Sequence, residues 1–149
     1  MENINKLMNS NITTSLNNSN VIEVIAGESN GSIIVLKTAK EHREFSLFVY
    51  CTWRLENESE IITGSNEPSD GNLLKIKTLI GEKILDVKQN RFNDLSIQFE
   101  SKKVLSIFCS ITGNVNWQDY TENWTFCDIE QNKCFHADNK NIIRTSEYE

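Results

Sequence analysis

The chain has 149 residues, of which 38% are hydrophobic and 24% charged, and its formal net charge is −6. This length fits one domain over residues 1–149. The negative net charge disfavours nucleic acid as a partner, because Lys and Arg supply most of the affinity for phosphates. The longest apolar runs, such as residues 33–36, are far below the roughly 18–20 residues that span a bilayer, so we expect no membrane segment.

The first twenty residues predict a polar helical segment. Ile4, Leu7, Met8, Ile12 and Leu16 recur at spacings of three and four, which places them on one helix face. Asn and Ser make this helix marginal alone, because their side chains compete for backbone hydrogen bonds. An export signal needs a basic start and an apolar stretch, whereas Asn, Ser and Thr dominate here. We therefore expect a cytoplasmic protein with reduced thiols.

Residues 21–26 and 32–37 are rich in β-branched side chains and flank a turn at 27–31, which predicts a hairpin. Between positions 45 and 55 every second residue is apolar, and this period predicts one long strand with a core face. Phe48 and Tyr50 fall on the opposite face. We therefore expect part of this strand to be covered on both sides, with a helix on one face of the sheet.

The segment 56–71 is polar and acidic, with Gly64 and Pro68 as breakers, and we expect most of it to be an exposed loop. Residues 72–80 predict a short helix with Leu73, Ile76 and Ile80 on one side. Ser69 or Asp70 is the expected cap, and Gly81 ends the helix.

Three further strands are predicted at residues 83–88, 94–100 and 104–109, the last two joined as a hairpin through 101–103. A final hairpin at 124–128 and 133–137 turns at 130–132, and the tail 138–149 is expected to fray. Successive strands lie too close for helical crossovers. The expected fold class is α+β, a mainly antiparallel sheet of about six to eight strands with an N-terminal helix and one short central helix.

Four residues are candidates for a zinc site, but their spacing argues against it. Structural zinc sites place two to four residues between paired cysteines, and six residues separate Cys127 from Cys134. Buried apolar cysteines are favoured instead, and we expect no metal and no cofactor. Catalytic cysteine is disfavoured as well, because Cys51 falls mid-strand on the core face. The weak metal candidates are Cys109, Cys127, Cys134 and His136.

The loop 113–124 is the most suggestive binding segment, because it carries aromatic and acidic residues in an otherwise polar stretch. Trp and Tyr are enriched among residues that dominate binding energy, and carboxylates steer a basic partner. The alternative is that these rings fold back onto a sheet edge, and Trp124 is expected in the core. The acidic segment 56–70 has two interpretations: it forms a second wall of this binding surface, or it is a solvated loop. The predicted partner-binding residues are Trp117, Asp119, Tyr120, Glu122, Glu67 and Asp70.

Four stretches and one residue carry a resemblance that covers about residues 45–126: Trp53–Glu56 (WRLE), Ile62–Ser65 (ITGS), Leu79–Ile84 (LIGEKI), Asp94–Phe99 (DLSIQF) and Trp124. With these, the chain resembles small bacterial proteins of the toxin-immunity type. The resemblance implies an intracellular inhibitor that binds one cognate toxin, and it brings no functional residue with it.

The leading hypothesis is a non-enzymatic, cytoplasmic immunity protein that occludes a basic toxin surface with an acidic, aromatic-bearing loop. One alternative is a small enzyme or ligand sensor with a pocket near Trp53 and Arg54, which requires a deep cavity there. Another is a phage-borne inhibitor of a host defence protein, which shares the same physics and differs only in its target. No catalytic residue is assigned, and the expected partner is a protein.

Overall fold

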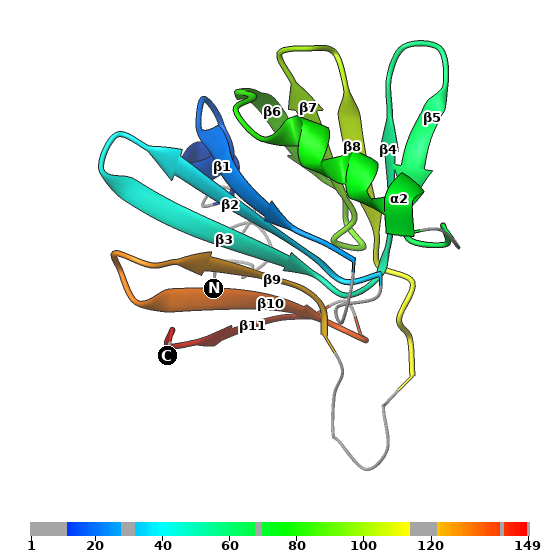
Figure 1. Cartoon of the computed structure of the whole chain (residues 1–149). Helices are drawn as coiled ribbons and strands as arrows, with labels where there is room; N and C mark the ends of the chain where they lie inside the picture. The colour runs from blue at the N-terminus through cyan, green and yellow to red at the C-terminus, as the bar shows by residue number, and fades with distance from the viewer. Residues whose placement is uncertain (1–11, 28–31, 68–69, 114–121, 141, 149) are drawn as a thin grey trace.

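The computed structural model describes residues 12–27, 32–67, 70–113, 122–140 and 142–148, and these build two antiparallel sheets (Figure 1). One sheet has six strands and the other has five. The prediction of mainly antiparallel strands is confirmed, but the predicted class α+β is too helical, because the described residues contain only two short helices and the architecture is mainly β. The prediction of one sheet with six to eight strands is wrong, because the strands belong to two separate sheets.

The six-stranded sheet has the order β1-β2-β3-β9-β10-β11. The predicted hairpins β1–β2 and β9–β10 are both confirmed, and Asn132 takes the left-handed backbone conformation (φ 54°) in the second turn. The strands are β1 (Asn20–Ile25), β2 (Ile34–Lys40), β3 (Arg43–Val49), β9 (Glu122–Asp128), β10 (Lys133–Asp138) and β11 (Ile143–Ser146).

The five-stranded sheet has the order β5-β4-β8-β7-β6. The predicted hairpin between β7 and β8 is confirmed, and Lys102 adopts φ 74° in its turn. The strands are β4 (Thr52–Glu56), β5 (Ile61–Gly64), β6 (Ile84–Gln89), β7 (Leu95–Phe99) and β8 (Val104–Phe108).

The predicted long strand at 45–55 is broken, because β3 and β4 belong to different sheets. The chain bends at Tyr50 and Cys51, whose backbone N–H groups both donate to the Asn123 carbonyl, at 2.9 and 3.2 Å. All six alternating apolar residues are nevertheless buried. The period therefore identified the core face correctly, and it missed the bend because the core lies on the same side of both strands.

The core lies between the two sheets and contains the large rings of Trp53, Trp124 and Phe126. Residues 12–16 are helical, and Ile12 and Leu16 join this core with at most 1% of their surface exposed. The predicted apolar stripe is confirmed at these two positions, and its residues 4–8 lie outside the described part of the chain. We expected this helix to cover Phe48 and Tyr50. It packs into the core instead.

The two sheets join at one corner, where β1 meets the start of β6. Asn20 forms a β-bridge with Lys83, the Val21 N–H donates to the Glu82 carbonyl, and the Gly81 N–H donates to the Val21 carbonyl. These bonds satisfy backbone groups that would otherwise form open edges of both sheets. Gly81 has φ 90°, a conformation that glycine adopts without steric cost.

The predicted central helix forms α2 (Asp70–Leu73), which continues as the 3₁₀ helix η2 (Leu74–Leu79). Its buried residues are Leu73, Ile76 and Leu79, whereas Ile80 is 47% exposed. The assignment of Ile80 to the buried side was therefore wrong. A 3₁₀ helix has three residues per turn, so its buried positions recur at intervals of three.

The tail was expected to fray, and this prediction is wrong, because β11 pairs with β10 and buries Ile143. The fully buried Asp138 carboxylate fixes the turn between these strands. It accepts hydrogen bonds from the N–H groups of Lys140 (2.8 Å) and Ile142 (3.0 Å) and from Arg144 Nε (2.7 Å). None of the helices in the described residues is long and apolar enough to cross a membrane.

Candidate functional site

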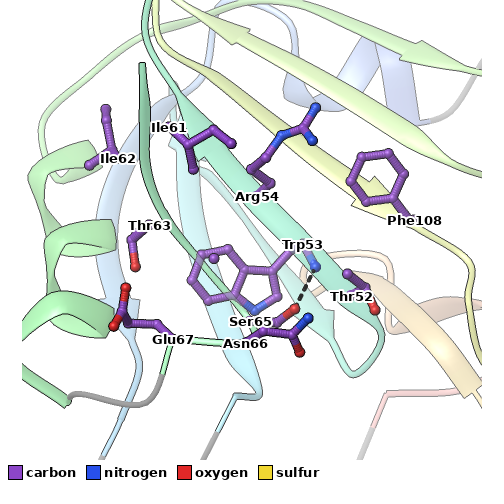
Figure 2. A pocket seen from close by; sticks show the side chains of 11 residues that line it. Thr52, Trp53, Arg54, Ile61, Ile62, Thr63, Ser65, Asn66, Glu67 and Phe108 are labelled. Carbon is purple, nitrogen blue, oxygen red and sulfur yellow. Dashed lines mark hydrogen bonds between the residues drawn. The ribbon is translucent and has the colours of Figure 1, made fainter.

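A groove of about 380 Å³ runs beside the β4–β5 hairpin (Figure 2). The acidic segment 56–71, expected as an exposed loop, supplies much of its wall, because residues 61–64 form β5 and pair with β4. Asn57 organises the connecting turn, since its Oδ1 accepts hydrogen bonds from the N–H groups of Ser59 and Glu60. Residues 56–64 thus lie in an ordered hairpin, and the loop prediction was wrong there.

Trp53 forms the rigid floor of the groove and is 1% exposed. Its indole Nε1 donates to the Ser32 carbonyl at 2.7 Å, which anchors the ring. Its backbone N–H donates to Ser65 Oγ, and its carbonyl accepts the Ser65 N–H, so the end of β5 is held beside it. Gly64 fits this close approach, because a Cβ there would stand 3.0 Å from the Trp53 carbonyl oxygen.

Arg54 places a positive charge at the groove. Its guanidinium lies over the Phe108 ring, 5.5 Å from the centroid, and its Nη2 stands 3.5 Å from Glu56 Oε1. Figure 2 shows Arg54 beside Phe108, with Ile61 on the neighbouring strand. Arg54 Nε and Thr63 Oγ1 are buried and have no hydrogen-bond partner among the described residues. Buried polar atoms normally find partners, so these two atoms stand out.

Glu67, a predicted partner-binding residue, is half-buried and lines this groove. Asp70 begins α2, and its side chain is not among those that the structure describes. Trp117, Asp119 and Tyr120 also lie outside the described residues, so their role stays a prediction. The groove combines Trp53 and Arg54, the pair named for the alternative pocket, with one carboxylate of the acidic segment.

Trp124 is fully buried, and its indole Nε1 donates to the Asn93 carbonyl at 2.8 Å. This confirms its assignment to the core.

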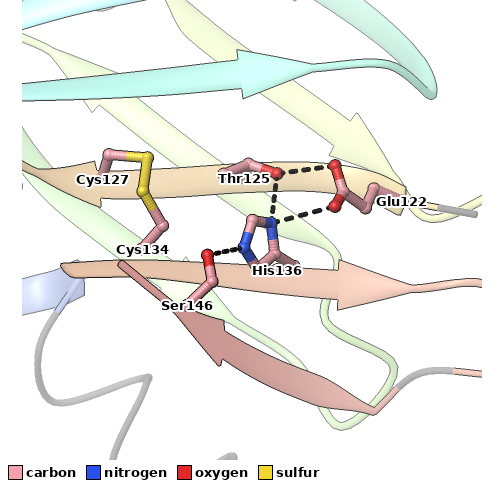
Figure 3. Close-up of a disulfide and its surroundings, with 6 residues drawn as sticks. All are labelled: Glu122, Thr125, Cys127, Cys134, His136 and Ser146. Atoms are coloured by element: carbon pink, nitrogen blue, oxygen red, sulfur yellow. Dashed lines mark hydrogen bonds and ion pairs between the residues drawn. A yellow bond between two sulfur atoms is a disulfide. The ribbon is translucent and has the colours of Figure 1, made fainter. Parts of the chain in front are cut away.

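Glu122 belongs to a polar network on the outer face of the six-stranded sheet (Figure 3). Its Oε1 stands 3.1 Å from His136 Nδ1, and its Oε2 accepts the Thr125 hydroxyl at 3.1 Å. His136 Nδ1 and Nε2 also contact Thr125 Oγ1 at 2.8 Å and Ser146 Oγ at 2.6 Å. The Glu122 carboxylate is therefore already engaged within the fold. Its role toward a partner stays a prediction.

The network shifts two pKa values. The hydrogen bond from His136, helped by its charge and by Thr125, outweighs burial and lowers the pKa of Glu122. Burial, helped by the negative charge of Glu122, raises the pKa of Tyr50. The order Ser146–His136–Glu122 matches that of a serine, base and carboxylate relay. Neither Ser146 nor His136 lines the groove, which separates the network from the cavity.

Cys127 and Cys134 form a disulfide between directly opposed residues of β9 and β10, with their Cα atoms 4.1 Å apart (Figure 3). Both are buried, as expected, but the expectation that they are reduced thiols is wrong. Their sulfurs are bonded to each other, so they are not free to bind zinc. The described residues hold no cluster of three or more metal-ligating side chains. Disulfides persist mainly in oxidising compartments, and the cytoplasmic location stays a prediction.

Sequence reasoning missed two parts of these sites. The run Ile61-Ile62-Thr63 is β-branched, and this signal for β5 was outweighed by the surrounding acidic residues. The pairing of His136 with Glu122 needed the register of β9 and β10, which no local pattern supplies.

Comparison of the chain with protein-family models, curated proteins and solved structures finds no match. The fold and site define an antiparallel, two-sheet β protein with a lateral groove. The resemblance to immunity proteins stays a prediction.

Proposed function

We propose that the chain is a non-enzymatic binding protein of the immunity type, which covers a basic surface of a toxin or effector protein. The observation that carries this proposal is the acidic β4–β5 hairpin with the groove at its side. The hairpin exposes the carboxylates of Glu58 and Glu60 next to Ile61, which is 62% exposed. Carboxylates around an apolar anchor are a common arrangement in protein interfaces, where a polar rim surrounds a dry centre.

Charge supports a basic partner. The net charge of −6 favours fast encounter with a positive surface, and exposed carboxylates contribute most to this steering. Glu58 pairs with Lys102 at 3.3 Å, but both side chains are largely exposed, at 69% and 75%. Such a pair contributes little to stability, so Glu58 can exchange Lys102 for a partner's cation at small cost.

The groove suits one side chain of the partner. Ile61 and Phe108 offer apolar contact, and the charged Arg54 and Glu67 stand among its lining residues. A partner residue with a polar tip and an apolar body, such as Tyr, would bury its ring there and direct its hydroxyl toward the charged side chains that line the groove. We propose Glu67 and Asp70 as further contacts of this surface, together with Trp117, Asp119 and Tyr120.

The test is calorimetric titration for affinity, with stopped-flow mixing for association rates, against the protein encoded by the adjacent reading frame. Glu58→Gln combined with Glu60→Gln is expected to slow association and to reduce its dependence on salt. Ile61→Asp is expected to weaken binding at least about 30-fold, the effect of losing a central apolar contact worth about 2 kcal/mol. Glu44→Gln combined with Glu147→Gln is the matched control, because it makes the same charge change at exposed positions outside the hairpin. Equal effects of the two double variants would refute the assigned surface, and no binding by wild type would refute the immunity role.

A small-ligand sensor is the second candidate, favoured by a groove volume that lies within the range of about 300–1,000 Å³ for small-molecule sites. Native mass spectrometry of protein from its own cells would then show a bound small molecule that Arg54→Ala releases. A phage-borne inhibitor of a host defence protein uses the same surface physics, and binding to that defence protein in the same titration distinguishes it.

A further inference from the structure

Two cysteines outside the existing disulfide occupy matching positions on neighbouring strands. The last registered pair at this end of β4 and β8 is Thr52 opposite Phe108. The next residues in the same register are Cys51 and Cys109, both with free thiols. On β4 the buried residues are Trp53 and Leu55, so Cys51 continues the core-facing row. Cys109 likewise continues the row of Leu105 and Ile107 on β8.

The backbone leaves these two residues unbonded to each other. The Cys51 N–H donates to the Asn123 carbonyl, and the Cys109 N–H donates to Asp94 Oδ1 at 2.6 Å. Neither N–H is directed at the opposing strand. This is the arrangement of a non-hydrogen-bonded pair in an antiparallel ladder, in which the Cα atoms approach to about 4.5 Å. Cys127 and Cys134, which are already joined, are also directly opposed residues of antiparallel strands.

The thiols themselves are neighbours. Interaction with the Cys51 thiol raises the pKa of Cys109, and burial and the charge of Asp94 act in the same direction. Cys109 Sγ also donates to the Asn93 carbonyl at 3.2 Å, which fixes its position. Cys51 is 4% exposed, yet it lines a small cavity of about 160 Å³ with Thr52 and Ser110, and Cys109 is partly exposed.

We propose that Cys51 and Cys109 form a second cross-strand disulfide site, closed by exchange with a small-molecule disulfide such as oxidised glutathione. The raised pKa of Cys109 keeps its thiolate scarce near neutral pH, so exchange begins slowly: the thiol loses its proton, the thiolate attacks one sulfur of glutathione disulfide, and the other glutathione leaves as a thiolate that takes up that proton. The Cys51 thiolate then attacks Cys109 Sγ and expels the second glutathione. Two protein thiols are oxidised, and one disulfide is reduced to two glutathione thiols.

Formation of the disulfide would act at the end of the groove that Thr52 lines. Cys51 lies in the bend where the chain passes from one sheet to the other, and the adjacent Thr52 lines both the groove and the small cavity. Thr52 Oγ1 is hydrogen-bonded to Ser110 Oγ at 2.9 Å across the same pair of strands. A covalent bond at 51–109 therefore fixes the strand ends that carry this wall. The proposal does not depend on the identity of the binding partner.

The experiment uses the full chain with the Cys127–Cys134 bond intact, incubated with oxidised glutathione under native conditions. The expected result is loss of both alkylatable thiols, a mass lower by two hydrogen atoms, and a digestion product that links Cys51 to Cys109. The oxidised protein should melt at a higher temperature. In Cys51→Ala, glutathione should remain attached to Cys109, because the resolving thiol is missing.

Three results would overturn the proposal: a wild-type protein that keeps a stable glutathione adduct, thiols that react only after denaturant is added, or peptides that link Cys51 to Cys127 or Cys134. If Cys51→Ala fails to fold, Cys109→Ala replaces it, since Cys109 is the more exposed of the pair. That variant should lose no mass and form no linked peptide, and oxidation of its Cys51 into a linked product would contradict the pairing.

Discussion

Replacing Asp138 by Asn removes the charge that holds β11 on the six-stranded sheet. The carboxylate is completely buried and accepts three hydrogen bonds, from the N–H groups of Lys140 and Ile142 and from Arg144 Nε. Asparagine has nearly the same shape and keeps one acceptor oxygen. Its amide nitrogen, however, can only donate, and so cannot accept the bond from Arg144.

The expected loss of stability is about 3 kcal/mol, because a hydrogen bond to a charged group contributes about 1.5–3 kcal/mol and two more bonds weaken when the charge disappears. For a domain of this size, that lowers Tm by about 6–12 °C. Urea unfolding measures the loss directly. Hydrogen exchange should also accelerate at the Lys140 and Ile142 amides. Arg144→Gln is the control and should cost less, because the Arg144 side chain is 42% exposed and its charge is partly screened.

The same reasoning fixes the pH dependence. Burial raises the pKa of Asp138, but hydrogen bonds from Ile142, Lys140 and Arg144 outweigh it, so the pKa in the folded protein is lowered. Stability from a lowered carboxyl pKa is present above the unfolded value of about 3.9 and is lost as pH falls through the folded value. The difference between wild type and Asp138→Asn should be constant at pH 5–7 and shrink in acid. Equal stability at pH 7 would refute this account.

Three further changes test other parts of the molecule. Cys127→Ser with Cys134→Ser should cost about 2–3 kcal/mol, since the bond closes a short loop, and reductant should produce the same loss in wild type during urea unfolding. Glu122→Gln should lower the pKa of Tyr50, because it removes the charge that helps to raise it; an unchanged ultraviolet titration would exclude that contact. Trp117→Ala with Tyr120→Ala should leave Tm nearly unchanged and weaken partner binding by more than about 2 kcal/mol, and unfolding would instead place these rings in the core.

Local patterns identified most strands, because alternation depends only on which face a residue presents. The row from Phe45 to Leu55 shows the limit of this signal. Its period persists through the bend at Tyr50 and Cys51, since both sheets enclose one core, and the bend itself depends on the distant Asn123 carbonyl. Strand β11 was missed for a related reason. Its attachment depends on a buried carboxylate, and a lone Asp in a polar tail carries no local signal.

The candidate site also has one part that the sequence identified and one part that only strand pairing brings together. Trp53 and Arg54 were singled out because they are conspicuous in the sequence, and they do line the groove. Phe108 also lines the groove, but it comes from a strand more than fifty residues away, and only the pairing of β4 with β8 brings it beside Arg54. The acidic segment was read from its charge, and its three consecutive β-branched residues decided the structure instead. The exposed Glu58 and Glu60 are compatible with this hairpin, because they lie in its turn, outside both strands.

Asn123 connects the groove with the predicted aromatic loop. Its side chain accepts the Ile111 N–H and donates to the Ile111 carbonyl, at 2.9 and 3.1 Å, so residues on either side of the 114–121 segment are held together. Ile111 lines the small cavity with Ser65 and Asn66, two residues that also line the groove. The roots of the loop and the wall of the groove therefore occupy the same end of the molecule. The turn of the β4–β5 hairpin lies at the other end of β4 (Figure 1), so only a partner that spans the length of the groove reaches both the turn and the loop, and we propose such a partner.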